Sequence, residues 1–184
     1  PTATPMAVAA AIRLRASTGK YADYRRLSKW RVGPKMKPRV YYAYQEKPGG
    51  IAQALALTEN FVGNDKFAVV LGDNIIQKSM KHAVDGFKEQ DGGAKIMLAE
   101  VENPKAYGVA RLEDDRVVEI IEKPSEPPSN WAVIGIYLYS PDVFEITRTL
   151  KPSARGALEI TDVNNEYIRR GLMSYDYVDG WWPD

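Results

Sequence analysis

A chain of 184 residues is long enough for one domain with a sizeable core. Hydrophobic residues make up 45% and charged residues 27%, as in ordinary globular proteins, and no apolar run approaches the roughly 20 residues of a membrane helix. Cysteine is absent, which excludes disulfides and thiolate metal sites and fits a reducing cytoplasm. We therefore expect one cytoplasmic domain that makes no contact with a membrane.

The net charge of +1 conceals an asymmetry along the chain. Residues 1–40 contain ten Lys or Arg and one acidic residue, whereas residues 41–184 contain fifteen basic and twenty-three acidic residues. A basic segment can bind nucleic acid, but here Gly and Pro interrupt it and no series of aromatic residues accompanies it. A solvated basic face is the simpler interpretation, and we expect no nucleic-acid partner.

The first 66 residues contain short predicted elements separated by Gly and Pro. A strand is expected at 12–16, a helix over 23–30, where apolar residues recur at spacing three, and a strand at 40–44. After Pro48-Gly49-Gly50, the Ala- and Leu-rich run over 51–61 predicts a further helix.

The next part of the chain alternates strands and helices. A continuous apolar strand is predicted at 67–71, a helix over 79–90 and a strand at 94–101. Together with the preceding helix, this order is typical of right-handed crossovers. It predicts an α/β fold: a three-layer α/β/α sandwich around a Rossmann-like, mostly parallel central sheet.

The second half of the chain changes this pattern. Two apolar stretches separated by Glu-Asp-Asp-Arg predict an inserted antiparallel hairpin, and a long apolar strand follows it. Ser140-Pro141 is a typical helix start. The predicted elements are the hairpin strands 107–112 and 117–121, a strand at 131–139, helices over 140–150 and 158–170, and a last strand at 175–178.

Asp73 follows the buried strand 67–71 directly, as part of Gly72-Asp73-Asn74. Ligands of open α/β sheets bind beyond the carboxyl ends of the strands. A lone carboxylate there serves Mg²⁺, which prefers oxygen ligands, or it caps the segment that follows. The two interpretations are equally supported by this stretch alone.

Three further motifs have both a functional and a structural interpretation. Pro48-Gly49-Gly50 suits a close approach to a bound anion, but a tight turn needs the same residues. Glu122-Lys123 offers an acceptor and a donor for a sugar hydroxyl and a phosphate, or forms a surface salt bridge. For Tyr137 and Tyr139 core packing is the default, and His82 is expected on the solvent face of its helix.

Six stretches, taken together, resemble the sugar-1-phosphate nucleotidyltransferases, most closely the glucose-1-phosphate thymidylyltransferases. They occur in the order of the family and at nearly its spacing over residues 41–184, which makes the resemblance specific. The stretches are QEKPGGIAQAL (45–55), FVGNDKFAVVLGDNII (61–76), NPKAYGVARLE (103–113), IIEKPSEPPSNWAVIGIYLY (120–139), RGALEITDVNNEYIRRG (155–171) and GWWPD (180–184).

The resemblance implies the nucleotide-diphospho-sugar transferase type of fold, and an enzyme that joins dTTP or UTP to glucose 1-phosphate and releases pyrophosphate. Its cofactor would be Mg²⁺, its partners these small molecules, and its assembly a homo-oligomer. The implied metal ligands and catalytic residues are Asp73 and Asp184. The implied nucleotide-binding residues are Gln45, Gly50 and Asp73, and the implied sugar-phosphate residues are Gly108, Glu122, Lys123 and Tyr137. Asp162 and Asn164 are interpreted as supporting or structural residues.

One part of the family pattern has no counterpart here. The glycine-rich signature G-G-x-G-T-R followed by P-x-T-K, which wraps the triphosphate, is not found in the sequence. We therefore expect a single nucleotidyltransferase domain, residues 1–184, that is incomplete at both ends and inactive as it stands. The alternative is a catalytically inactive, nucleotidyltransferase-like regulatory or nucleotide-sensing subunit.

Overall fold

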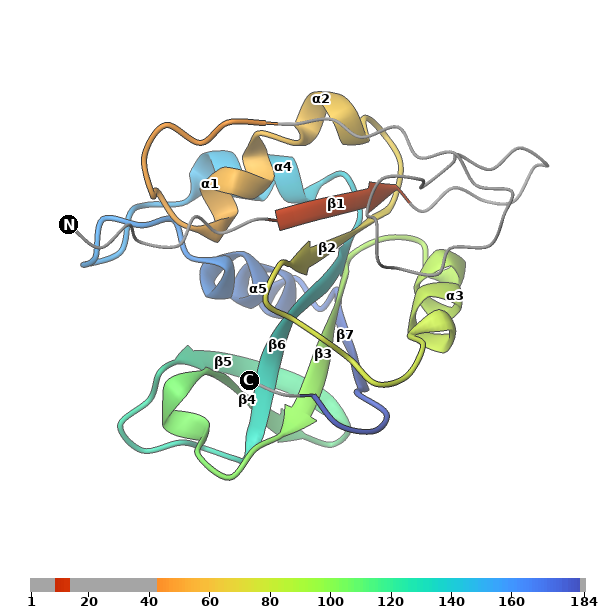
Figure 1. Ribbon diagram of the computed structural model, residues 1–184, viewed down its shortest axis with the longest axis vertical. Helices are drawn as coiled ribbons and strands as arrows, with labels where there is room; N and C mark the ends of the chain where they lie inside the picture. Colours follow the sequence, from red (N-terminus) through yellow and green to blue (C-terminus); the bar gives the residue numbers. More distant parts are fainter. Residues whose placement is uncertain (1–8, 14–42, 183–184) are drawn as a thin grey trace.

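The computed structural model describes residues 9–13 and 43–182 of the chain (Figure 1). The helix predicted at 23–30 and the predicted ligand Asp184 lie outside the described residues. The strand predicted at 12–16 overlaps the observed strand β1, Ala9–Arg13. Residues 43 and 44 are not in a strand, and the rest of the strand predicted at 40–44 is not described.

The described residues form a seven-stranded sheet with helices on both faces (Figure 1). After β1, the strands are β2 Phe67–Leu71, β3 Ala94–Glu100, β4 Gly108–Glu113, β5 Arg116–Glu122, β6 Trp131–Tyr139 and β7 Met173–Tyr177. The helices are α1 Ile51–Ala56, α2 Glu59–Val62, α3 Lys81–Glu89, α4 Val143–Thr149 and α5 Ile160–Arg169, with a 3₁₀ turn η1 at Pro104–Ala106. The α/β class is therefore confirmed.

The sheet has the order β1-β2-β6-β3-β7, and the β4–β5 hairpin branches from β6. Strands β2, β3 and β7 run in one direction, but β6 lies between β2 and β3 and is antiparallel to both. β6 begins opposite the end of β3, where Trp131 pairs with Glu100, because the hairpin that precedes it lies at that end. Because no helical crossover connects β3 to β6, the chain runs back antiparallel, and β3 and β7 are the one pair of neighbouring parallel strands in the described sheet. The described sheet is therefore mixed, which corrects the expectation of a mostly parallel central sheet.

Side chains of the central strands point alternately to the two faces of the sheet, which divides the core into two layers. Ile96 and Leu98 of β3 pack with Tyr139 of β6 on the face covered by α1, α4 and α5. Met97 and Ile136 face the other way, toward α3. Because the strand period is two residues, each central strand contributes to both layers, and the predicted three-layer sandwich is confirmed.

Two local predictions are confirmed with small changes. The predicted hairpin closes through Asp114 and Asp115, whose φ angles of 48° and 56° suit a two-residue turn. The helix predicted over 51–61 is interrupted between α1 and α2, where the Thr58 hydroxyl donates to the Leu55 carbonyl at 2.7 Å. Such a bond competes with helix continuation.

Among the described residues, none of the helices has both the length and the apolar character needed to cross a membrane.

Candidate functional site

Glu122, the last residue of β5, is at the centre of a polar corner. Its Oε2 accepts a hydrogen bond from the Thr161 hydroxyl at 2.8 Å, and its Oε1 lies 3.7 Å from a guanidinium nitrogen of Arg155. Gly108 is the cross-strand partner of Glu122, and a Cβ on Gly108 would lie 3.4 Å from Oε2. The structure thus brings two predicted residues, Gly108 and Glu122, together and leaves space above the carboxylate.

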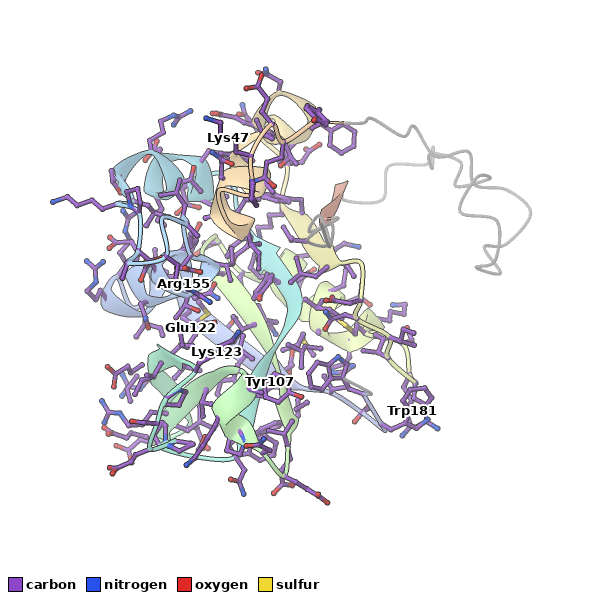
Figure 2. All side chains as sticks on the ribbon, turned by 60° about the vertical axis from the view of Figure 1, so that its left-hand side comes forward. Lys47, Tyr107, Glu122, Lys123, Arg155 and Trp181 are labelled. Carbon is purple, nitrogen blue, oxygen red and sulfur yellow. The ribbon has the colours of Figure 1, made fainter. Side chains whose placement is uncertain are left out.

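Lys123 leaves the sheet directly after Glu122. Its φ of 45° is in the left-handed region, and its N–H donates to the Tyr107 carbonyl at 2.9 Å, which turns the chain away from the hairpin. The side chain is exposed. Figure 2 shows Arg155, Glu122 and Lys123 following one another along the same side of the molecule.

A cavity of about 540 Å³ lies beside this corner. The end of β5, the loop 153–155 and the start of α5 enclose it. The charged side chains that line it are Glu119, Glu122, Lys123, Arg155, Glu159 and Asp162. Burial raises the pKa of Asp162, and the negative charges of Glu159 and Glu122 add to that rise. The cavity therefore combines a concentration of carboxylates with two cations.

Tyr137 is a buried residue of β6, and the charges of both Glu122 and Asp73 act on it. The side chain is 4% exposed and stacks on Tyr139 at 6.0 Å between ring centroids, so the core-packing interpretation is confirmed for both tyrosines. Burial raises the pKa of Tyr137, and the negative charges of Glu122 and then Asp73 raise it further. Its hydroxyl therefore stays protonated.

Asp73 is exposed in the loop that follows β2. Its Oδ1 accepts a hydrogen bond from Nδ2 of Asn74 at 2.8 Å. The next helix, α3, has Met80 at its N-cap position and no side-chain capping bond, so Asp73 does not cap it. The capping alternative therefore loses its support.

Asp184 lies outside the described residues, but the segment just before it lies against the Asp73 loop. Nε1 of Trp182 donates to Oδ1 of Asn74 at 3.0 Å. The Gln77 N–H donates to the Trp181 carbonyl at 3.2 Å, and the Trp181 N–H donates to Oε1 of Gln77 at 3.1 Å. In the described part of the chain, no group of three or more His, Cys, Asp or Glu side chains could hold a metal ion.

Gln45 lies at the start of the described chain, against the loop before α1. Its Nε2 donates to the Gly50 carbonyl at 3.2 Å and to Oε1 of Gln53 at 2.7 Å. Because the Gly50 acceptor is a backbone carbonyl, this bond fixes which end of the Gln45 amide faces inward. The amide oxygen Oε1 of Gln45 is then the end available to a ligand.

Gly50 has a φ of 94°, and a Cβ there would lie 2.3 Å from the Leu158 carbonyl oxygen. The N–H of Ala52 donates to this same carbonyl at 3.2 Å, and the Leu158 N–H donates to Gly49 at 2.8 Å. The start of α1 therefore binds the chain itself, and the turn interpretation of Pro48-Gly49-Gly50 is favoured over an anion site.

Sequence reasoning missed four side chains that the structure places in or beside the site: Gln53, Asn74, Arg155 and Thr161. Each contacts a predicted residue, as the bonds above show. Nothing in their local sequence distinguishes them from surface polar residues. Asn164, by contrast, is 1% exposed and accepts a bond from the Tyr139 hydroxyl at 2.6 Å, so its structural interpretation is confirmed. His82 is exposed, as expected.

The sequence also matches a known family over nearly its whole length. Residues 15–184 match the family model described as "Nucleotidyl transferase". The chain therefore belongs to the nucleotidyl transferase family.

Individual relatives show which members of the family this chain resembles. The low-salt glycan biosynthesis nucleotidyltransferase Agl11 of Haloferax volcanii is 44% identical over 79% of this chain and 41% of its own length. A glucose-1-phosphate thymidylyltransferase of Neisseria meningitidis is 42% identical over 73% of this chain and 48% of its own length. One of an Actinoplanes species is 45% identical over 74% of this chain and 45% of its own length. The chain thus spans about half the length of the curated relatives it matches.

Solved structures agree with this comparison. A crystal structure of a candidate glucose-1-phosphate thymidylyltransferase from Bacillus anthracis, in complex with sucrose, is 51% identical. Its TM-score is 0.74, over 78% of this chain and 58% of that one. A UDP-glucose pyrophosphorylase complexed with UDP-glucose is 28% identical, with a TM-score of 0.70 over 80% and 60% of the two chains.

Proposed function

We propose that this chain is part of an enzyme that transfers a nucleotidyl group from dTTP, or from UTP, to glucose 1-phosphate. The products are dTDP-glucose, or UDP-glucose, and pyrophosphate. The relatives named glucose-1-phosphate thymidylyltransferases support this substrate class. The observation that carries the proposal is the cavity at Glu122, where Lys123 and Arg155 stand beside a hydrogen-bonded carboxylate.

In this proposal the Glu122 corner binds the sugar phosphate. A carboxylate held by Thr161 can accept hydrogen bonds from sugar hydroxyls, and Gly108 leaves the room for them. The protonated Tyr137 hydroxyl is a donor at the same corner. Lys123 and Arg155 supply positive charge for the phosphate. The Arg155 guanidinium can turn to the phosphate because its ion pairs with Glu122 and Glu159 are 3.7 and 3.1 Å long and its side chain is more than half exposed.

The Gln45 amide binds the pyrimidine base in this proposal. With Nε2 occupied by Gly50 and Gln53, the free Oε1 accepts a hydrogen bond. Thymine and uracil carry an imide N–H that can donate it, whereas the same ring position of cytosine has no hydrogen. The orientation of Gln45 therefore supports dTTP and UTP equally.

Asp73 and Asp184 would hold Mg²⁺. The residue types fit the ion, because Mg²⁺ prefers oxygen ligands and takes one or two carboxylates together with substrate phosphates, and Asp73 is exposed to receive it. When bound, Mg²⁺ supplies a Lewis acid that neutralises charge on the triphosphate.

The chain's residues then act by positioning. An oxygen of the glucose 1-phosphate forms a bond to the α-phosphorus, in line with the bond to the bridging oxygen that breaks, and pyrophosphate leaves. Lys123 and Arg155 hold the attacking phosphate and reduce its repulsion from the triphosphate. No side-chain nucleophile is required.

Release of pyrophosphate by the full-length protein tests the proposal. We expect product with dTTP or UTP and glucose 1-phosphate, and turnover that disappears on removal of Mg²⁺ with a chelator. If neither nucleotide gives product with any sugar phosphate, the proposal is wrong and the regulatory alternative is favoured. The Asp73→Asn variant should fold normally and lose turnover by at least 100-fold, because it removes one ligand charge.

The remaining expectations follow from the same proposal. The partners are small molecules, the reaction takes place in the cytoplasm, and the enzyme is a homo-oligomer. Light scattering of the full-length protein, measured with the activity assay, checks the last of these.

A further inference from the structure

We propose that Asn74 is the positioning residue of the metal site, and that it aims the Asp73 carboxylate while it ties the segment before Asp184 to the same loop. This inference rests on the proposed function of Asp73. It follows from the bonds of one carboxamide group, all of which go to other residues of the chain.

The carboxamide of Asn74 is oriented without ambiguity. Its Oδ1 accepts from two groups that can only donate, the backbone N–H of Gly135 at 2.9 Å and the indole N–H of Trp182 at 3.0 Å. The amide nitrogen must then occupy the other position, where it donates to Asp73 at 2.8 Å. Two fixed donors on one side thus determine where the third bond points.

Gly135 allows this arrangement. It lies in β6 and is buried, and a Cβ there would lie 2.4 Å from Nδ2 of Asn74. A side chain at this strand position would displace the carboxamide. The absence of a side chain in the middle of an otherwise apolar strand is therefore explained by the close approach of Asn74.

Asn74 also anchors the far end of the described chain. Trp182 packs edge-on against Tyr107, with 5.5 Å between ring centroids, and its N–H reaches Asn74. Asp184 follows two residues later, a distance the chain spans in at most about 7 Å. One carboxamide therefore contacts both Asp73 and Trp182, the residue two positions before Asp184 in the sequence.

A second attachment of the same segment provides the control. Gln77 binds Trp181 through both its N–H and its Oε1, and no bond links it to Asp73 among those that the structure describes. Asn74→Ala removes the bonds to Asp73, Gly135 and Trp182, whereas Gln77→Ala removes only the side-chain bond to the Trp181 N–H and keeps the backbone bond. Comparing the two variants separates orientation of Asp73 from attachment of the segment.

The test is a titration of the full-length protein with Mn²⁺ alone, followed by electron paramagnetic resonance. We expect Asn74→Ala to weaken Mn²⁺ binding by about tenfold, as loss of a partner of a metal ligand does, and Gln77→Ala to remain within twofold of the wild type. Asn74→Ser, which cannot span the three bonds, carries the same expectation if the alanine variant does not fold.

Two results would overturn the inference: Mn²⁺ binding by Asn74→Ala within twofold of the wild type, or an equal loss in Gln77→Ala. Failure of the wild type to bind Mn²⁺ would overturn it as well. If the wild type binds Mn²⁺ but releases no pyrophosphate, the proposed function fails, and the comparison of the variants still decides the role of Asn74.

Discussion

At the level of single residues, Glu122 is a carboxylate whose two oxygens have different partners. One oxygen is held by Thr161 and the other faces Arg155 at a distance too long for a hydrogen bond. The sequence predicted the pair Glu122-Lys123 but left a surface salt bridge open as the alternative. The structure shows that Glu122 pairs with a different cation, from a loop more than 30 residues away.

Replacing Glu122 with Gln should raise the KM for glucose 1-phosphate by about tenfold with a small change in kcat, because hydrogen bonds to a charged acceptor contribute about 1.5–3 kcal/mol. Steady-state kinetics at saturating nucleotide measures this. Glu119→Gln is the matched control, since Glu119 lines the same cavity but lies 3.4 Å from Nε of Arg111. Equal effects of the two variants would contradict a direct role for Glu122.

At the level of elements, α3 depends on a side chain from outside the helix. Lys66 precedes β2, and its ammonium donates to the Phe87 and Lys88 carbonyls at 3.2 and 3.0 Å and also to the Gln90 carbonyl. The C-terminal carbonyls of a helix have no partners within it, and a cation near them is also attracted to the negative end of the helix dipole. Lys66 therefore attaches the only helix on its face of the described sheet.

Lys66→Met should lower the free energy of unfolding by about 1–2 kcal/mol, since it keeps the aliphatic stem and removes the three bonds. Urea denaturation followed by circular dichroism measures the change. Lys81→Met, at the exposed start of α3, should have little effect because its ion pair with Asp85 is on the surface. A Lys66 variant as stable as the wild type would show that the helix end is satisfied by water.

At the level of the whole molecule, the loops before α1 and α5, which carry the two proposed ligand regions, meet at Gly50 and Leu158. The loop before α1 holds Gln45, and the loop before α5 carries Arg155. Two backbone hydrogen bonds join these segments, from the Ala52 N–H to the Leu158 carbonyl and from the Leu158 N–H to the Gly49 carbonyl, and Gly50 packs closely against Leu158. Gln45 and Arg155, which we propose contact the nucleotide and the sugar phosphate, are 110 positions apart in the chain, and these contacts hold their segments together.

Gly50→Ala should destabilise the protein and raise the KM for both substrates, because a Cβ would meet the Leu158 carbonyl and push the two loops apart. Gly156→Ala is the control: its φ of 75° is also left-handed, but nothing lies within 4 Å of the added atom. The control should lose about 1 kcal/mol from backbone conformation alone. If Gly50→Ala loses no more than the control in thermal unfolding, the packing argument is wrong.

Much of the fold could be predicted from the sequence because periodicity and turn chemistry are local properties. The buried strand at 67–71, the helix at 79–90 and the hairpin around Glu-Asp-Asp-Arg all follow from them. The direction of β6 could not be predicted, because a fully buried strand has the same apolar sequence whether its neighbours run parallel or antiparallel.

For the candidate site, the sequence alone determined which residue types are present: carboxylates and donors, no cysteine, and a single histidine. These limits favour oxygen ligands and argue against a Cys–His or Ser–His–Asp nucleophile. Only the tertiary structure decided which residues meet. Thr161 and Arg155 reach Glu122, and Trp182 reaches Asn74, because strand order and loop packing bring together segments that are far apart in sequence. Hydrogen bonds act over about 3 Å, so their partners depend on the folded chain.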